Sequence, residues 1–114
     1  MIPEIDVQLL AERLRSRDTF VLLDVREAWE LESAKIADAR LEVAPMSRLA
    51  NEGLEALPES ARDPGAEIYV ICHTGMRSAD VTGWLASQGW TNVHSVRGGI
   101  DAFARNIDGS VGFY

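Results

Sequence analysis

A single cysteine, Cys72, occupies the place in this sequence that is best suited to nucleophilic chemistry. It follows the apolar run Ile68-Tyr69-Val70-Ile71 and precedes His73-Thr74-Gly75-Met76-Arg77-Ser78. We interpret these stretches as a buried strand, a six-residue loop and the start of a helix. A thiol in that setting is favoured as the thiolate, because inward-facing loop N–H groups and the helix dipole both stabilise negative charge. The pattern predicts a catalytic thiol, although a lone cysteine is often only a small buried apolar side chain.

Several neighbours of Cys72 have side chains that would support such a thiolate. Gly75 lets the loop turn tightly without a Cβ penalty. Arg77 can either attract an anionic substrate or hold the loop in place. Ser78 can cap the helix that follows, and His73 can tune the thiolate or contribute to substrate binding.

A second pair of charged residues, Asp24 and Arg26, follows the apolar run Phe20-Val21-Leu22-Leu23. Asp24 is predicted to be structural, because a carboxylate beside a thiolate would disfavour the negative charge on sulfur. Two roles stay open for Arg26. It either contacts substrate at the rim of the site, or it pairs with Glu27 or Asp24 and fixes the end of the strand.

The elements that must position these residues alternate along the chain between strands and helices. The predicted strands are 20–23, 40–43, 68–71 and 93–96. The predicted helices are 7–14 with Asp6 as N-cap, 28–32, 46–57, 78–88 and a last helix around 100–104. This alternation is typical of an α/β fold with a central, mostly parallel sheet and helices on both faces. Because ligands bind at the carboxyl ends of such strands, we expect Asp24, Arg26 and the Cys72 loop to share one edge of the sheet.

The composition restricts the classes of function. The 114 residues are predicted to form one domain, 1–114, and a single cysteine cannot form an internal disulfide. The formal net charge of −7 argues against nucleic acid and anionic membranes as partners. With no apolar leader and no run long enough to span a bilayer, the sequence favours a cytoplasmic protein. One cysteine and two histidines without ligand spacing predict no metal site and no cofactor.

Three motifs together resemble the single-domain rhodanese family, the thiosulfate sulfurtransferase-like proteins. They stand in family order with family-like spacing, and the resemblance extends over nearly the whole chain. The motifs are Leu22-Leu23-Asp24-Val25-Arg26-Glu27, Cys72-His73-Thr74-Gly75-Met76-Arg77-Ser78 and Val96-Arg97-Gly98-Gly99-Ile100-Asp101-Ala102-Phe103.

The resemblance implies a rhodanese-like fold and sulfur transfer without a cofactor. Cys72 would take a sulfane sulfur from a small anionic donor such as thiosulfate and become a persulfide. It would then pass that sulfur to cyanide or to a thiol, either a small thiol or one on a thioredoxin-like protein. The loop from His73 to Ser78, with Arg26, would bind the substrate.

The chain departs from the family pattern in two places. The family usually has Gly-His-Ile-Pro-Gly-Ala after its first helix, where this chain reads Ala34-Lys35-Ile36-Ala37-Asp38-Ala39, and Phe103 stands where a tryptophan is common. Both departures are expected to affect local packing rather than the nucleophile. His94 and the three tryptophans are predicted to be structural as well.

Two hypotheses of other classes stay open beside sulfur transfer. Cysteine phosphatases and arsenate reductases of similar architecture use Cys-x5-Arg or a longer loop, whereas this chain has the shorter Cys-x4-Arg from Cys72 to Arg77. A smaller ring suits one sulfur atom better than a tetrahedral oxyanion. The second hypothesis is a non-catalytic module that binds a partner or senses redox state, although such modules usually lose the cysteine. Thiosulfate, polysulfide, glutathione persulfide and a protein persulfide all remain candidate donors.

Overall fold

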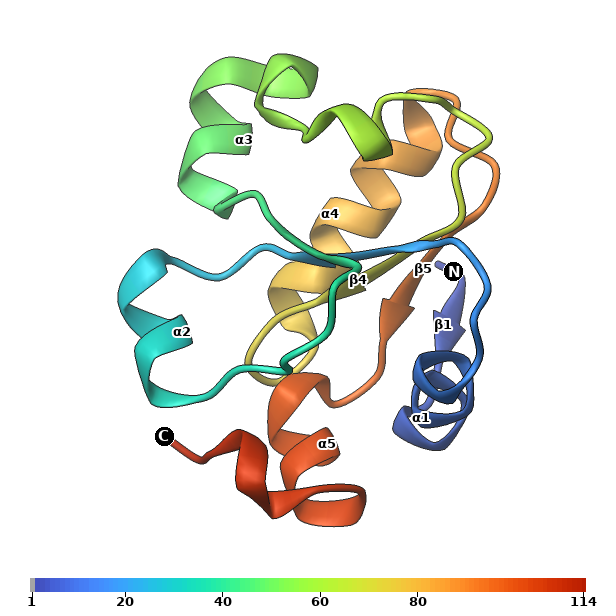
Figure 1. The fold of residues 1–114 in the computed structure, drawn as a ribbon. Coiled ribbons are helices and arrows are strands. Elements are labelled where there is room, and N and C mark those ends of the chain that lie inside the picture. Colours follow the sequence, from blue (N-terminus) through green and yellow to red (C-terminus); the bar gives the residue numbers. More distant parts are fainter. Residues whose placement is uncertain (1) are drawn as a thin grey trace.

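The computed structural model describes residues 2–114, and its secondary structure alternates strand and helix from end to end (Figure 1). The strands are β1 (Glu4–Ile5), β2 (Val21–Asp24), β3 (Leu41–Val43), β4 (Ile68–Ile71) and β5 (Val93–Val96). The α-helices are α1 (Val7–Arg15), α2 (Ala28–Ser33), α3 (Met46–Glu52), α4 (Met76–Ser87) and α5 (Gly99–Asn106). Three short 3-10 helices complete the fold: η1 (Gly53–Ala56), η2 (Glu59–Ala61) and η3 (Gly109–Val111).

The strands form one sheet in the order β1-β5-β4-β2-β3, and every neighbouring pair is parallel. This confirms the predicted α/β fold with a parallel central sheet. The strand β1 was not predicted, because two residues are too few to carry a periodic signal. In the register between β2 and β4, Asp24 lies opposite Ile71. Asp24 therefore sits one residue from the level of Cys72 at the carboxyl edge of the sheet.

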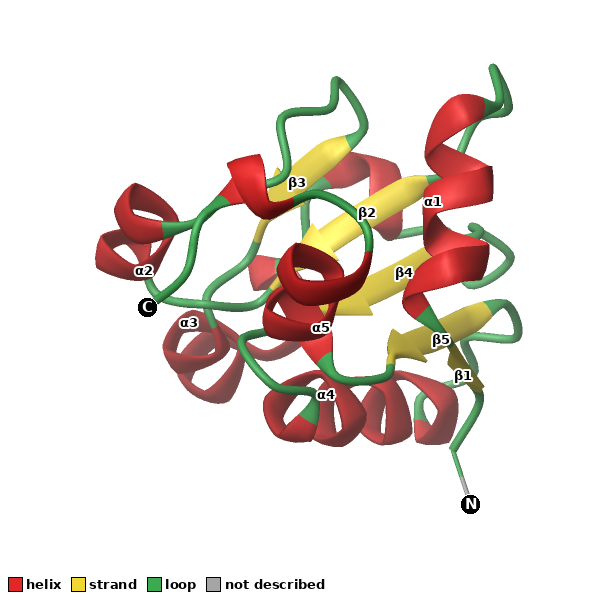
Figure 2. Cartoon of the chain, turned by 90° about the horizontal axis from the view of Figure 1, so that it is seen from below, coloured by secondary structure: helices red, strands yellow, loops and turns green. Residues whose placement is uncertain are grey.

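The central strands are buried on both faces, which explains their continuous apolar runs. Alternate residues point to opposite sides of a strand, and they divide the core into two clusters. Leu22 and Ile71 pack with residues of α1 and α5, whereas Leu23 and Val70 pack with residues of α3 and α4. Figure 2 shows α1 and α5 on one side of the sheet and α3 and α4 on the other. The alternation places Cys72 in the cluster of α3 and α4.

Two predicted helix boundaries were wrong. The helix after Cys72 begins at Met76 rather than Ser78, with Gly75 as its N-cap, so the loop is two residues shorter than expected. The helix predicted over 46–57 ends as an α-helix at Glu52, because Gly53 has a positive φ of 65° and the chain continues as a 3-10 turn. Hydrophobic spacing alone does not reveal such a backbone break.

Other local predictions can be compared with the structure. The Asp6 side chain accepts a hydrogen bond from the Leu9 N–H at 2.8 Å, which confirms it as the N-cap of α1. Phe103 is buried in the core and Lys35 is exposed. Trp29 is 64% exposed and lies outside the core, and its ring packs against Tyr114. Within residues 2–114, the helices are all too short or too polar to cross a membrane.

Candidate active site

The sulfur of Cys72 is surrounded by hydrogen-bond donors from the loop and from the first turn of α4. The Gly75 N–H donates to Sγ at 3.1 Å and the Ser78 N–H at 3.3 Å. The Ser78 hydroxyl lies 3.4 Å from the same sulfur. These are the inward-facing amides that the sequence predicted, and they are fixed in place before any charge forms on sulfur. The site can therefore hold an anionic sulfur without a general base beside it.

The loop can take this shape because of Gly75. Its φ of +106° is a left-handed conformation, and a Cβ at this position would lie 3.0 Å from the Gly98 nitrogen. Both facts favour glycine, since other residues rarely adopt this φ. Ser78 is the third residue of α4 and not its N-cap, which corrects the predicted role. Its hydroxyl donates to the Gly75 carbonyl at 3.2 Å, so Ser78 closes the turn from inside the helix.

The amino end of α5 holds the loop from its other side. The Ile100 N–H donates to the Cys72 carbonyl at 2.9 Å and the Asp101 N–H to the His73 carbonyl at 3.0 Å. These donors are free because the first turn of a helix leaves its N–H groups without intrahelical partners. A Cβ on Gly99 would lie 2.5 Å from both carbonyl oxygens. The two glycines before Ile100 therefore allow α5 to approach the Cys72 loop closely.

Arg77 is fixed by an acidic partner that the sequence analysis did not identify. Its two terminal nitrogens each donate to a different oxygen of Glu30 at 2.7 Å. Glu30 lies in α2 and is buried, and it also accepts a hydrogen bond from the Glu27 N–H. The hydrogen bonds from Arg77 lower the pKa of Glu30 to about 2, and the pKa of Arg77 is raised in turn. The pair joins the first turn of α4 to α2, so Arg77 holds the loop.

The structure selects one of the two roles left open for Arg26. The side chain is fully buried, and it donates to both carboxylate oxygens of Asp24, with Nη2 to Oδ2 at 2.7 Å. Burial lowers the pKa of Arg26, but the hydrogen bonds and the charge of Asp24 outweigh it, and the net shift is upward. With its guanidinium away from solvent, Arg26 does not form a rim that substrate can touch in this conformation. The Asp24 carboxylate is itself buried and is bonded to Arg26.

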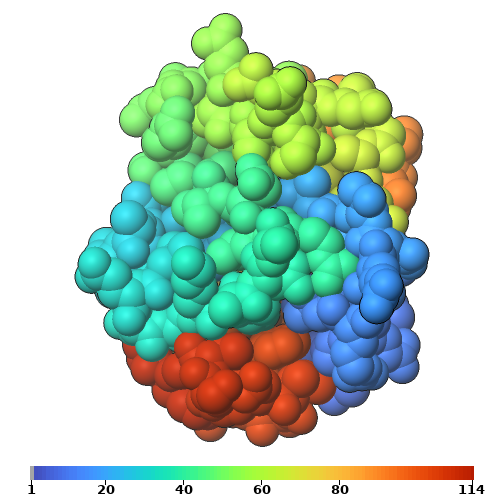
Figure 3. Space-filling view, in the orientation of Figure 1, coloured from blue at the N-terminus to red at the C-terminus, as the bar shows by residue number. Residues whose placement is uncertain are grey.

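Tyr114 packs on the Cys72 loop, although it lies in a C-terminal segment without hydrophobic periodicity. Its ring stacks on His73 with 3.9 Å between ring centres and 15° between planes. Its hydroxyl donates to Glu30 at 2.9 Å and accepts from Arg26 at 3.3 Å, while the edge of Trp29 contacts its ring. Burial raises the pKa of Tyr114. Figure 3 shows the C-terminal residues in red, packed beneath the cyan segment that includes α2.

These contacts leave Cys72 with 1% of its surface exposed. Thr74 and Met76 are the solvent-exposed residues of the loop, and Met76 is 78% exposed. Of the residues that the sequence selected, Gly75 and Ser78 contact the Cys72 sulfur, while Arg77 and Arg26 are linked through Glu30 and Tyr114. An acidic residue three positions after Glu27, in the pattern of a capping box, was the available signal for Glu30. Nothing local in the sequence indicated Tyr114.

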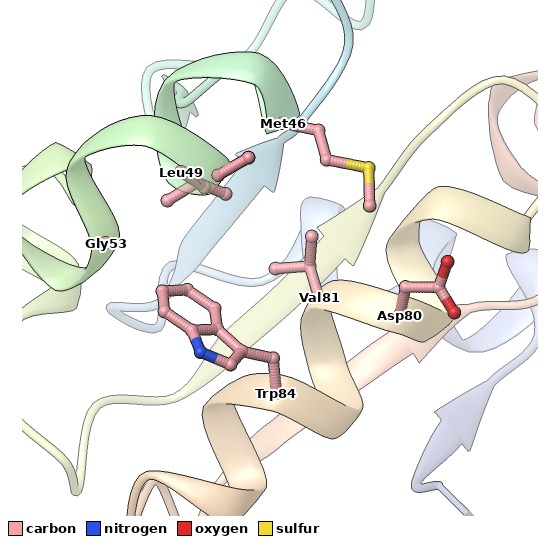
Figure 4. A pocket seen from close by; sticks show the side chains of 7 residues that line it. Met46, Leu49, Gly53, Asp80, Val81 and Trp84 are labelled. Carbon is pink, nitrogen blue, oxygen red and sulfur yellow. The ribbon is translucent and has the colours of Figure 1, made fainter.

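A separate groove of about 330 Å³ lies between α3 and α4. Figure 4 shows Met46 and Leu49 of α3 on one side of it and Val81 and Trp84 of α4 on the other, with Asp80 and Gly53 beside them. Cys72 is not among its lining residues, so the groove does not open onto the Cys72 sulfur. Among residues 2–114 there is also no group of three or more His, Cys, Asp or Glu side chains that could bind a metal ion.

Comparison with known proteins gives consistent results for the whole chain. The profile of the Rhodanese-like domain family matches residues 6–106. A sulfurtransferase of Allochromatium vinosum is 34% identical over 106 residues, which is 93% of this chain and 92% of that protein. A thiosulfate sulfurtransferase of Actinobacillus pleuropneumoniae serotype 3 is 30% identical over 99 residues, covering 78% of this chain and 91% of that protein.

Some of the matched proteins are longer, and this chain spans between 19% and 47% of their length. Among solved structures, the crystal structure of a rhodanese-related protein from Thermoplasma volcanium superimposes with a TM-score of 0.73 at 31% identity. It covers 92% of this chain and 93% of that one.

Proposed function

This chain belongs to the Rhodanese-like domain family, and from that premise we propose that it is a sulfurtransferase that works through a persulfide on Cys72. The carrying observation is the set of polar groups around one sulfur atom: two backbone N–H groups that donate to it at 3.1 and 3.3 Å, and a hydroxyl in contact with it at 3.4 Å. Such a set of groups favours a thiolate before transfer and an anionic persulfide after it. Relatives of the same length that are named sulfurtransferases support the same reaction class.

The first half-reaction takes up sulfur from a small anionic donor, for which thiosulfate is the simplest candidate. The Cys72 thiolate attacks the sulfane sulfur of thiosulfate, an S–S bond forms to Cys72, and the donor S–S bond breaks to release sulfite. The negative charge of the thiolate passes to the terminal sulfur of the persulfide. Because Cys72 is 1% exposed, residues around the loop must move to admit the donor.

The second half-reaction returns the enzyme to its starting state. An acceptor thiolate, or cyanide, attacks the terminal sulfur of the Cys72 persulfide and takes it away as a new persulfide or as thiocyanate. The bonding electrons stay with Cys72, which becomes a thiolate again. We propose a thiol acceptor, either a small thiol or one on a thioredoxin-like protein, because a thiolate exchanges readily with the sulfur–sulfur bond of a persulfide.

The direct test is intact mass spectrometry of the protein before and after incubation with thiosulfate. We expect a gain of one sulfur atom, about 32 Da, that a thiol or cyanide reverses, as thiol–disulfide exchange chemistry requires. The Cys72→Ser variant is the control, and it should fold normally and gain nothing.

A gain from polysulfide or glutathione persulfide but not from thiosulfate would retain the reaction class and change the donor. No gain from any donor would contradict the proposal. Hydrolysis of para-nitrophenyl phosphate that disappears in Cys72→Ser would then support phosphoryl chemistry in its place.

A further inference from the structure

Ser95, a strand residue that the proposed reaction does not use, lies directly behind the hydroxyl that faces the nucleophile. It belongs to β5 and is fully buried, as is Ser78. The two hydroxyl oxygens are 2.8 Å apart. Ser78 in turn lies 3.4 Å from the Cys72 sulfur and 3.2 Å from the Gly75 carbonyl. A chain of polar atoms therefore runs from the sheet to the sulfur.

Counting hydrogens fixes the direction of this chain. Each serine hydroxyl has one hydrogen to donate. Across the described part of the chain, the Ser95 hydroxyl has no hydrogen-bond partner other than Ser78. If Ser78 donated to Ser95, the Ser95 hydrogen would be buried without an acceptor, which is costly. Ser95 must therefore donate to Ser78, and this leaves the Ser78 hydrogen free for another acceptor.

The hydrogen of Ser78 then has two possible acceptors, and the charge on sulfur decides between them. While Cys72 is a neutral thiol, its S–H donates to Ser78 and the Ser78 hydroxyl donates to the Gly75 carbonyl, so every hydrogen has a partner. When the sulfur is anionic it attracts the Ser78 hydrogen more strongly than a carbonyl does. The Gly75 carbonyl stays satisfied, because the Ala79 N–H also donates to it at 3.2 Å.

We propose that Ser95 is a positioning residue for the nucleophile. It holds the Ser78 oxygen as an acceptor, so that the Ser78 hydrogen is available to the Cys72 sulfur whenever that sulfur carries negative charge. Two hydroxyls in series also polarise each other, which strengthens the bond to sulfur. The benefit of this arrangement for catalysis rests on the proposed function. The stabilisation of the anionic Cys72 sulfur itself can be measured without any sulfur donor.

The test is a titration of the Cys72 thiolate by its ultraviolet absorbance in wild type and in Ser95→Ala. The chain has no other cysteine, so the difference between each protein and its own Cys72→Ser counterpart reports Cys72 alone. We expect the Ser95→Ala curve to move to higher pH, with about threefold to tenfold less thiolate at the foot of the curve, because a hydrogen bond to a charged group is weakened.

A double-mutant cycle separates positioning from packing. If Ser95 acts through Ser78, the Ser95→Ala change moves the titration curve in wild type but not in a Ser78→Ala background. Thr82→Val is the matched control. Thr82 is buried on α4, the helix of Ser78, and its hydroxyl has no hydrogen-bond partner among residues 2–114. Its removal should leave the curve in place.

Two results would overturn the inference: a Ser95→Ala curve that superimposes on wild type, or an equal shift in the Ser78→Ala background. Failure of the proposed function would be a separate result. In that case Ser95→Ala would shift the Cys72 titration curve as expected, but the wild-type protein would gain no sulfur from any donor.

Discussion

At the scale of single residues, the two arginines near Cys72 are matched by carboxylates rather than left free for substrate. Arg77 is bonded to Glu30 and Arg26 to Asp24. A bidentate arginine–carboxylate pair fixes geometry as well as charge. The positive charges near Cys72 are thus largely compensated, and the groups in direct contact with its sulfur are neutral N–H and O–H groups.

Arg77→Ala should weaken the fold and the sulfur transfer in a way that does not depend on donor charge. Glu30 would be left buried without its partner, and we expect a loss of about 1 to 3 kcal/mol of stability, since Arg77 is itself partly exposed. Urea unfolding measures the loss of stability. Rates of sulfur loading from thiosulfate and from an uncharged donor of sulfane sulfur measure the loss of sulfur transfer.

The double variant with Glu30→Gln is the control and should recover part of the stability lost in Arg77→Ala. A much larger loss for the anionic donor would instead mean that Arg77 attracts substrate directly.

Glu30 should also make stability depend on acidity. Its pKa is about 2 in the folded protein against an ordinary value of 4.5. The unfolded chain therefore takes up the proton first as pH falls, and the stabilisation present above the ordinary value is lost on the way down to about 2.

We expect the melting temperature to fall less steeply with acidification over this range in Glu30→Gln than in wild type. Glu12→Gln, at an exposed position of α1, should keep the wild-type slope. Identical slopes in all three proteins would show that the Arg77–Glu30 pair is not a determinant of acid stability.

At the scale of elements, the nucleophile loop is held between two helices. The first turn of α4 directs N–H groups at the sulfur, while the first turn of α5 directs N–H groups at the carbonyls of Cys72 and His73. The loop thus has donors on both sides, and its shape depends on how closely α5 approaches. Gly99 is the position at which that approach is tightest.

Gly99→Ala should destabilise the protein and disturb sulfur loading together. Its φ of +61° is unfavourable for alanine, and the new Cβ would meet two backbone oxygens at 2.5 Å that cannot easily move. Gly89→Ala separates these two causes. Gly89 has a φ of +105° but nothing within 4 Å of the added Cβ.

We expect each change to cost more than about 1 kcal/mol for backbone strain, with a clearly larger loss and slower loading only in Gly99→Ala. Equal effects in urea unfolding and in the loading assay would remove the contact with the loop as the cause.

At the scale of the whole molecule, the protein and its proposed donor carry charge of the same sign. The formal net charge is −7, and the arginines nearest to Cys72 are already paired. Long-range repulsion should therefore slow the arrival of thiosulfate, and salt should relieve it, because exposed charges are screened within about 10 Å at moderate ionic strength.

We expect the rate constant for sulfur loading from thiosulfate to rise about twofold to threefold as salt increases from roughly 10 to 200 mM. Alkylation of Cys72 by iodoacetamide, which is uncharged, is the control and should stay nearly constant. A thiosulfate rate that falls with added salt would indicate a locally positive entrance instead.

The sequence by itself predicted four of the five strands, the helices that cover the sheet and Cys72 as the candidate nucleophile. These features depend on periodicity and on residues adjacent in the chain, such as the apolar run before Cys72 and the glycine within its loop. The carboxyl-end rule then placed Asp24 and Cys72 at one edge, and the parallel register between β2 and β4 agrees.

Only the tertiary structure decided which side chains complete the site. Glu30 and Arg77 are 47 residues apart in the sequence, and Tyr114 and Glu30 are 84 residues apart. Ser95 of β5 contacts Ser78 of α4. Whether Arg26 faces solvent or Asp24 likewise depends on what packs around it. Such contacts follow from how separate elements pack, and no local pattern of residue types records that packing.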